Sequence, residues 1–181
     1  MVRKFQLLGF GLLLLFKGTA QDNFARLTTM IGSHIEFNFN TLDKYSSGIR
    51  ITDGTTLALT MQNLPAGSAV TGWHLDVQSW LAQPTIDGSG GNVLPLNTIQ
   101  IEATDANGNL AGSTFFGLQD LAIAPGATLM TTAGLGAEVP ADPNTHQINL
   151  SYECGIANGS LLGSTSDYYT IEVEIILIPD F

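Results

Sequence analysis

The sequence predicts an all-β fold, an antiparallel β-sandwich in a single domain. Apolar and polar residues alternate along many short stretches, which is the period of a strand with one buried face. One polar face per strand is typical of antiparallel sheets, since parallel sheets are covered on both faces. Turn-forming pairs such as Asp53-Gly54 and Asn107-Gly108 separate the stretches, and helical periodicity is almost absent.

The first twenty residues have the composition of a secretory signal peptide. Basic residues precede an apolar block, and the small residues Gly18 and Ala20 lie before an expected cut at Gln21. We therefore expect export to the periplasm, the exterior of the outer membrane or the cell surface. The rest of the chain lacks a second apolar run of about 18 residues, so we expect it not to span a membrane.

Residues 21–32 are expected to form an N-terminal arm ahead of a β-sandwich domain at 33–181. Phe24–Ile31 has apolar residues at helical spacing, but an extended arm accounts for them equally well. The candidate partner contacts of the arm are Phe24, Leu27 and Met30.

The expected strands follow in chain order, each with one apolar face. Their apolar positions are Ile35, Phe37 and Phe39; Ile49 and Ile51; Leu57, Leu59 and Met61; Trp73, Leu75 and Val77; Ile99, Ile101 and Ala103; and Ile148, Leu150 and Tyr152. We expect Asp53-Gly54 to be a turn between two strands. We expect Ala106–Asn109 to close a hairpin between Ile99–Thr104 and Leu110–Phe116.

The last expected strand, Asp167–Ile178, differs from the others near its end. Its apolar face holds Tyr169, Ile171, Val173, Ile175 and Leu177. From Ile175 onward both faces become apolar, and such a strand needs cover on both faces. A loop of the same chain, a neighbouring subunit or an extended arm could supply the cover, so Ile176 and Ile178 are further candidate partner contacts.

The net charge limits the classes of partner. The full chain carries −10, and removal of residues 1–20 leaves three basic against sixteen acidic residues, a charge of −13. A polyanion repels phosphate backbones, so nucleic acid is excluded as a partner. Anionic membrane surfaces are disfavoured for the same reason. Solubility outside the cytoplasm is the simplest role for this charge.

No residue pattern points to catalysis, a cofactor or a metal, so we expect a non-enzymatic protein with no cofactor. His34, His74 and His146 are scattered, without the spacing of zinc ligands. Asp105 begins a loop that resembles the start of a calcium loop, but the twelfth position is Phe116 instead of the required glutamate.

The lone cysteine excludes an intrachain disulfide. Cys154 continues the alternation of Ile148, Leu150 and Tyr152. We therefore expect a buried, inert thiol, although an intermolecular thiol is the alternative.

Two aromatic residues are candidates for stacking on a sugar ring. The alternation from Trp73 to Val77 places Trp80 on the polar face of its strand. Tyr168 is likewise expected on the outward face of the last strand. A bulge at Ser79 would instead turn Trp80 into the core. The two interpretations stay open.

A resemblance to a known group rests on four segments: Thr19–Gln21, Ser151–Gly155, Leu161–Gly163 and Asp167–Ile178. With them the chain resembles pilin-like and spore-coat-U-like exported surface proteins of the Bacteroidota type, which have an immunoglobulin-like or pilin-like sandwich. The single cysteine departs from the cysteine pair common in chaperone–usher pilins.

The signal peptide, the lack of catalytic motifs and the two-sided apolar end of the last strand together predict a structural or assembly subunit of a cell-surface or outer-membrane complex or fibre. Such a subunit acts through protein–protein contacts of its strand edges and N-terminal arm. The alternative is a carbohydrate-binding or adhesin module that uses Trp80 and Tyr168.

Overall fold

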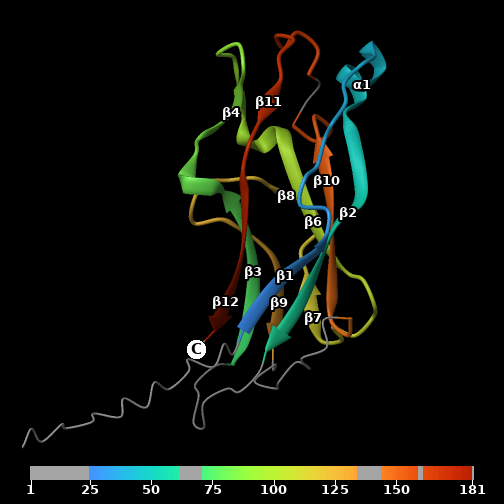
Figure 1. The fold of residues 1–181 in the computed structure, drawn as a ribbon, viewed down its shortest axis with the longest axis vertical. Helices are drawn as coiled ribbons and strands as arrows, with labels where there is room; N and C mark the ends of the chain where they lie inside the picture. Colours follow the sequence, from blue (N-terminus) through green and yellow to red (C-terminus); the bar gives the residue numbers. More distant parts are fainter. Residues whose placement is uncertain (1–24, 62–70, 134–143, 159–160, 181) are drawn as a thin grey trace, which may run out of the picture.

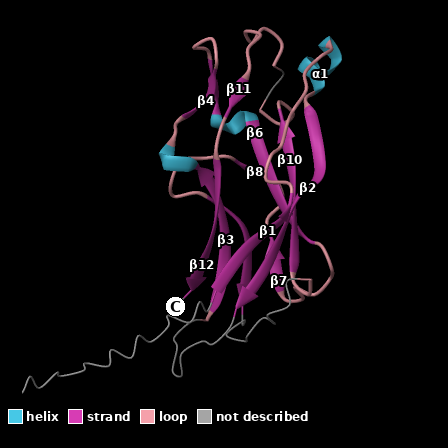
Figure 2. Ribbon diagram, viewed as in Figure 1, coloured by secondary structure: helices cyan, strands magenta, loops and turns pink. Residues whose placement is uncertain are grey.

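The computed structural model describes residues 25–61, 71–133, 144–158 and 161–180 (Figure 1). The signal-peptide prediction for residues 1–20 and the candidate contact Phe24 lie outside this part of the chain. Within it, strands dominate and two antiparallel sheets pack face to face (Figure 2). The prediction of an all-β sandwich in a single domain is confirmed.

The first sheet has the strand order β1-β2-β10-β6-β8, with every neighbouring pair antiparallel. Its strands are β1 (Ala25–Ile31), β2 (Ile49–Met61), β10 (Gln147–Cys154), β6 (Ile99–Asp105) and β8 (Gln119–Asp120). Residues 25–31 are therefore extended and paired with β2, which excludes the helical alternative for this stretch.

The second sheet has the order β12-β3-β9-β7, and a small third sheet has the order β11-β4-β5. The strands of the second sheet are β12 (Val173–Asp180), β3 (Gly72–Ser79), β9 (Ala127–Ala133) and β7 (Ser113–Phe115). Those of the third are β11 (Tyr169–Thr170), β4 (Thr85–Gly88) and β5 (Val93–Pro95). The third sheet lies at one end of the sandwich, beyond β3 and β12 (Figure 1).

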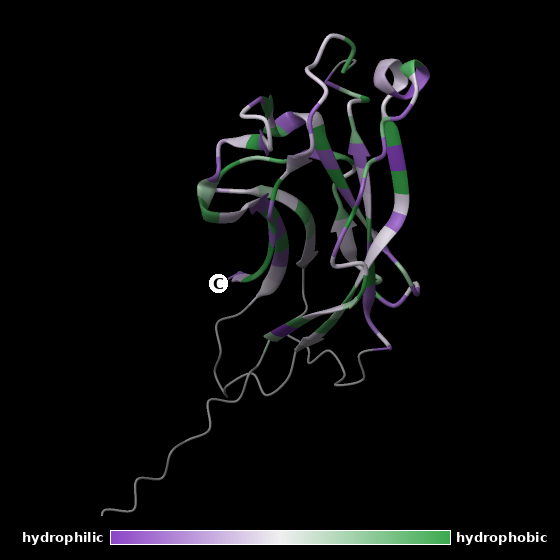
Figure 3. Cartoon of the chain, turned by 45° about the horizontal axis from the view of Figure 1, so that its top comes forward, coloured by the Kyte–Doolittle hydropathy of each residue, from purple (hydrophilic) through white to green (hydrophobic). Residues whose placement is uncertain are grey.

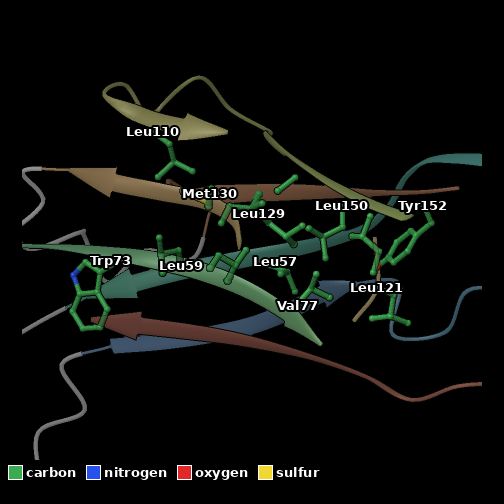
Figure 4. Packing of buried hydrophobic residues seen from close by; sticks show 14 of the residues in the cluster. Leu57, Leu59, Trp73, Val77, Leu110, Leu121, Leu129, Met130, Leu150 and Tyr152 are labelled. Atoms are coloured by element: carbon green, nitrogen blue, oxygen red, sulfur yellow. The ribbon is translucent and has the colours of Figure 1, made fainter. Parts of the chain in front are cut away.

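The core lies between the two large sheets (Figure 4). Along β3 the burial alternates as predicted, with Trp73, Leu75 and Val77 almost fully buried. They pack with Leu57 of β2 and Leu150 of β10. Figure 3 shows the same alternation as bands of opposite hydropathy along the ribbons. Hydrophobic burial between the sheets therefore supplies the main stabilisation of the fold.

One long side of the sandwich is closed by chain that crosses between the sheets. β7, β8 and β9 belong alternately to the second, first and second sheet. Leu110 and Leu121, on the connections beside them, are buried in the core. The opposite side has β1 and β12 as its edge strands. After Ile31 the chain leaves the sheet, and this second side is where the sandwich opens.

Asp53-Gly54 lies inside β2 and is not a turn between two strands, so that prediction is wrong. Thr52–Gly54 bulge opposite Ser151 of β10, and the pairing of β2 with β10 resumes on both sides. Asp53 has φ 51°, and its N–H donates to Ser151 Oγ at 3.1 Å. Because both flanks stay paired, the residues that favour a turn bend the strand instead of reversing it.

The predicted hairpin between Ile99–Thr104 and Leu110–Phe116 is also wrong. β6 pairs with β10 on one edge and with β8 on the other, so it has no free edge for β7. β7 pairs with β9 in the second sheet. The carboxylate of Asp105 instead shapes a crossing loop: it accepts backbone N–H bonds at 2.8–3.1 Å from Asn107, Gly108 and Leu110.

The predicted last strand, Asp167–Ile178, divides between two sheets. β11 pairs with β4, whereas β12 pairs with β3. The predicted inner face is largely kept, since four of its residues pack on the core: Tyr169, Ile171, Ile175 and Leu177. The fifth, Val173, is 36% exposed.

Candidate functional site

The open side of the sandwich leads into a cleft of about 1130 Å³ between the sheets. One wall is the chain from Gly32 to Phe39, and the other runs from Ser164 to Val173. The third sheet contributes Ile86 and Leu94. Parts of the chain far apart in sequence therefore enclose one cavity.

The first wall is an extended segment, Ser33–Asn40, that belongs to no sheet. Its inward side chains Ile35, Phe37 and Phe39 are half-buried and alternate with exposed residues. The sequence predicted this alternation correctly, but the segment is not a strand. None of its N–H groups donates to another group of the described residues. Of its carbonyls, that of Asn38 accepts from Lys44 Nζ at 3.1 Å.

Both ends of the Ser33–Asn40 segment are fixed. At one end Gly32 (φ 74°) lies against Gly54 so closely that a Cβ would collide with the Gly54 carbonyl. The Gly32 carbonyl also accepts from Thr55 Oγ1 at 2.6 Å. At the other end the Phe39 ring lies 5.4 Å from that of Tyr45 in helix α1 (Leu42–Ser47). The wall is thus held in place without being paired.

Helix α1 begins and ends where the sequence requires. Thr41 caps it by accepting a hydrogen bond from the Lys44 N–H at 3.3 Å, and Gly48 ends it with φ 73°. Its ends therefore hold Tyr45 where it can meet Phe39.

The second wall is fixed by the carboxylate of Asp167. It accepts hydrogen bonds at 2.7–3.0 Å from four groups: Ser89 Oγ, the Gly90 N–H, Asn92 Nδ2 and the Tyr168 N–H. The side-chain hydrogen bonds from Asn92 and Ser89 hold the pKa of this carboxyl well below its usual range. The loop between β4 and β5 is thereby tied to the chain ahead of β11.

The floor of the cleft is partly polar. Tyr152 donates its hydroxyl proton to Thr55 Oγ1 at 2.7 Å, and burial raises the pKa of this tyrosine. Cys154 also lines the floor and is 7% exposed, so the prediction of a buried thiol is confirmed. Burial raises the pKa of Cys154 to about 12. Neither group is ionised near neutral pH.

Both sugar-stacking candidates line this cleft. Trp80 is 43% exposed and Tyr168 is 62% exposed. Ser79 is fully buried, so the alternation of β3 continues to Trp80 without the bulge that would have turned it inward. The backbone N–H of Trp80 donates to the Glu172 carbonyl at 2.9 Å, which joins the two cleft-lining regions.

The four described partner candidates lie away from the cleft. Leu27 of β1 packs on the core, and Met30 is exposed at a bulge between Thr29 and Ile31. Ile176 and Ile178 are half-buried on the outer face of β12, opposite Asp76 and His74. Their role as partner contacts stays a prediction.

The cleft lining is acidic. Its carboxylates are Glu36, Asp87, Asp167 and Glu172, and no lysine or arginine of the described chain lines it. Among the described lining residues, His34 is the one with a basic side chain. A bound partner therefore meets apolar walls and a negative field.

The described residues hold no group of three or more His, Cys, Asp and Glu side chains placed to ligate a metal. A cluster of three titratable side chains lies on the outer face of the second sheet. There His74 Nδ1 lies 2.6 Å from Asp180 Oδ1, and its Nε2 lies 3.6 Å from Asp76 Oδ2. Across the same residues, no helix has the length and apolar character to cross a bilayer.

The cleft itself was not predicted from the sequence. The alternation at Ile35–Phe39 and at Tyr169–Ile175 was visible, but it indicated two ordinary strands. Alternation of apolar and polar residues indicates which side chains face inward, but it does not show whether the backbone pairs with another strand. A family match could have supplied that information; no family model and no curated protein matches this chain.

Proposed function

We propose that this protein is a non-enzymatic, exported subunit of a cell-surface or outer-membrane complex or fibre that binds a protein partner in its cleft. The observation that carries the proposal is the cleft on the open side of the sandwich, which has apolar walls and an acidic lining between Ser33–Asn40 and Ser164–Val173.

The apolar walls of the cleft and their fixed positions support a polypeptide as the occupant, and the volume is sufficient for one. Pockets for small molecules commonly measure about 300–1,000 Å³. At about 1130 Å³, with apolar residues such as Ile35, Phe37 and Ile171 along its walls, this cleft suits a chain segment with several side chains. Hydrogen bonds at Gly32 and Asp167 hold the two walls in place. A preformed site loses less conformational entropy on binding.

The chemistry of the cleft supports binding more than catalysis. A general acid or base works best when its pKa is near the operating pH. The pKa of Asp167 is lowered, away from neutral pH. Its carboxylate oxygens already accept hydrogen bonds from four donor groups. The Tyr152 and Cys154 groups are held neutral by burial.

Site-specific photocrosslinking in cells that produce the protein tests the proposal. A photoreactive residue at Tyr168, which lines the cleft, is expected to give one discrete protein adduct. The same residue at Thr104, an exposed position on β6 outside the cleft, is expected to give none.

Two charge substitutions decide whether that adduct depends on the cleft. Val173→Glu changes a half-exposed cleft residue and is expected to abolish the adduct, whereas Val93→Glu, exposed on β5 outside the cleft, keeps it. Light scattering of the purified protein with the captured partner then shows whether a complex forms. A monomer that stays monomeric with every candidate partner, or an adduct that survives Val173→Glu, contradicts the proposal.

A second candidate function is favoured by one observation: Trp80 and Tyr168 line the same cleft. Exposed aromatic faces and carboxylates in one groove also suit a glycan, because sugar rings stack on aromatics and their hydroxyls donate to carboxylates. A glycan array tests this function. Trp80→Ala and Tyr168→Ala should each remove binding, and an array without any bound glycan eliminates it.

A further inference from the structure

The Ser33–Asn40 segment has the conformation of a strand and the hydrogen-bonding state of a loop. Its side chains alternate between half-buried and exposed, as in a sheet. Yet its N–H groups donate to nothing within the described residues. A fixed, extended backbone with free donors is a template for another strand.

The length of the segment fits one added strand. Eight residues at about 3.3 Å each span about 26 Å, and strands of globular proteins commonly have 5–6 residues. The contacts of Gly32 and Phe39 fix the two ends, so the backbone between them is already ordered. An added strand would gain main-chain hydrogen bonds at little cost in ordering this chain.

The two faces of an added strand would meet different parts of the cleft. One set of alternate residues would face the apolar lining formed by Phe37, Ile171 and Ile175. The other set would face the rim, where carboxylates such as Glu36 and Glu172 are exposed. Alternation of apolar and basic residues therefore matches the site, because main-chain bonds give affinity and the alternate pockets give specificity.

We propose that the cleft binds an extended peptide segment with alternating apolar and basic residues, which pairs through its backbone with Ser33–Asn40. This inference rests on the proposed function and identifies the chemistry of the partner. A second copy of this chain fits less well, because two acidic chains repel one another.

The test uses synthetic peptides and the purified protein. The probe is a nine-residue peptide of alternating lysine and valine with blocked ends. The first control replaces every lysine by glutamate, and the second carries N-methyl groups on alternate valines. Binding is measured by calorimetry at two salt concentrations, and hydrogen–deuterium exchange locates the amides that become protected.

The lysine–valine probe is expected to bind at least about tenfold more tightly than the glutamate control, and more weakly at high salt. Exchange should slow across residues 33–40, and the N-methylated probe should lose that protection. Glu36→Gln and Glu172→Gln should weaken binding of the probe severalfold. Asp120→Asn, on β8 outside the cleft, is the matched control.

Four results overturn the inference. Equal binding of the lysine and glutamate peptides removes the charge argument. If the probe binds but the amides of residues 33–40 are not protected from exchange, the proposed backbone pairing is wrong. This holds even if crosslinking from Tyr168 identifies a partner in the cleft. If no peptide binds, the segment pairs with another occupant. The same follows if residues 33–40 are protected in the protein alone, because the protein then associates with itself. If Tyr168 crosslinks to nothing in cells while the probe binds, the proposed function fails and the peptide chemistry stands.

Discussion

The carboxylate of Asp167 lies 2.9 Å from the backbone N–H of Gly90, a residue 77 positions earlier in the chain. The same carboxylate also accepts from Ser89 and Asn92. One half-buried side chain thus fixes the glycine-rich loop between β4 and β5 to the second cleft wall.

The hydrogen bonds of Asp167 predict an acid-dependent loosening of this wall. They favour the carboxylate, so the pKa of Asp167 lies below the unfolded value of about 3.9. Its contribution to stability is therefore complete above about pH 4 and is lost as the pH falls further. The protection of the Gly90 amide, which is its intrinsic exchange rate divided by the observed rate, should fall as the pH drops below 4 in the native protein. In Asp167→Asn this protection should already be lower at pH 7 and should change little with pH.

Gly88, the last residue of β4, is predicted to be hard to replace. A Cβ at this position would overlap the Asp167 carboxylate and would lie 2.9 Å from the Asn92 carbonyl oxygen. Gly88→Ala should cost about 1–3 kcal/mol of unfolding free energy, the usual cost of forced overpacking. Urea denaturation measures it. Gly117→Ala, where an added Cβ meets nothing within 4 Å, is the control and should be close to neutral. An equal effect of both substitutions contradicts the steric explanation.

Periodicity predicted which side chains are buried more reliably than which strands pair. The spacing correctly predicted the burial of Trp73, Leu75 and Val77. Cys154 is buried as well, as the alternation along its strand predicted. Burial is a local property of alternation, because one face of each strand meets the same core. Pairing depends on which edges remain free after distant strands have joined.

The errors follow from that difference. Asn107-Gly108 is a good hairpin signal, yet β6 has both edges occupied by strands that the local sequence does not reveal. The Ile35–Phe39 alternation likewise could not show that its backbone stays unpaired. The cleft therefore could not be predicted, although two of its lining residues, Trp80 and Tyr168, were among the candidates for outward-facing aromatics.

The rim of the cleft contains backbone strain that a substitution should relieve. Leu81 follows Trp80 with φ 51°, and its side chain is 81% exposed. The left-handed conformation costs most L-residues about 1–2 kcal/mol, and asparagine tolerates it better. Leu81→Asn should raise the unfolding free energy by about 0.5–1 kcal/mol without loss of buried contacts. Leu42→Asn, at an equally exposed helical position, should give no gain, and a gain there would attribute the effect to lower surface hydrophobicity.

Arg50 is predicted to be the most important charge on the first sheet. It donates to Glu153 of β10 and to Glu102 of β6, each at 2.5 Å, and so joins three adjacent strands. The Glu153 side chain is only 8% exposed. Arg50→Met would leave this carboxylate buried and unpaired, at a cost of about 1–3 kcal/mol in urea denaturation.

The double variant Arg50→Met with Glu153→Leu separates loss of the ion pair from the unpaired charge. Most of the lost stability should return, because replacing a buried pair by apolar residues is often neutral. A double variant as unstable as the single one would show that Arg50 acts through packing of its aliphatic stem.

Cys154 offers a direct measure of how far the cleft opens. Thiol reagents attack the thiolate, and burial raises the pKa of Cys154 to about 12. At pH 8 iodoacetamide should therefore label the folded protein about a thousandfold more slowly than the unfolded one, since an exposed thiol has a pKa of about 8.5. Because the folded pKa is raised, the stabilising contribution is complete below about pH 8.5 and falls as the pH rises above it. Labelling in urea is the control for reagent activity. Rapid labelling of the folded protein at pH 8 would mean that water reaches the cleft floor beside Tyr152, and that the sheets separate far more than their packing indicates.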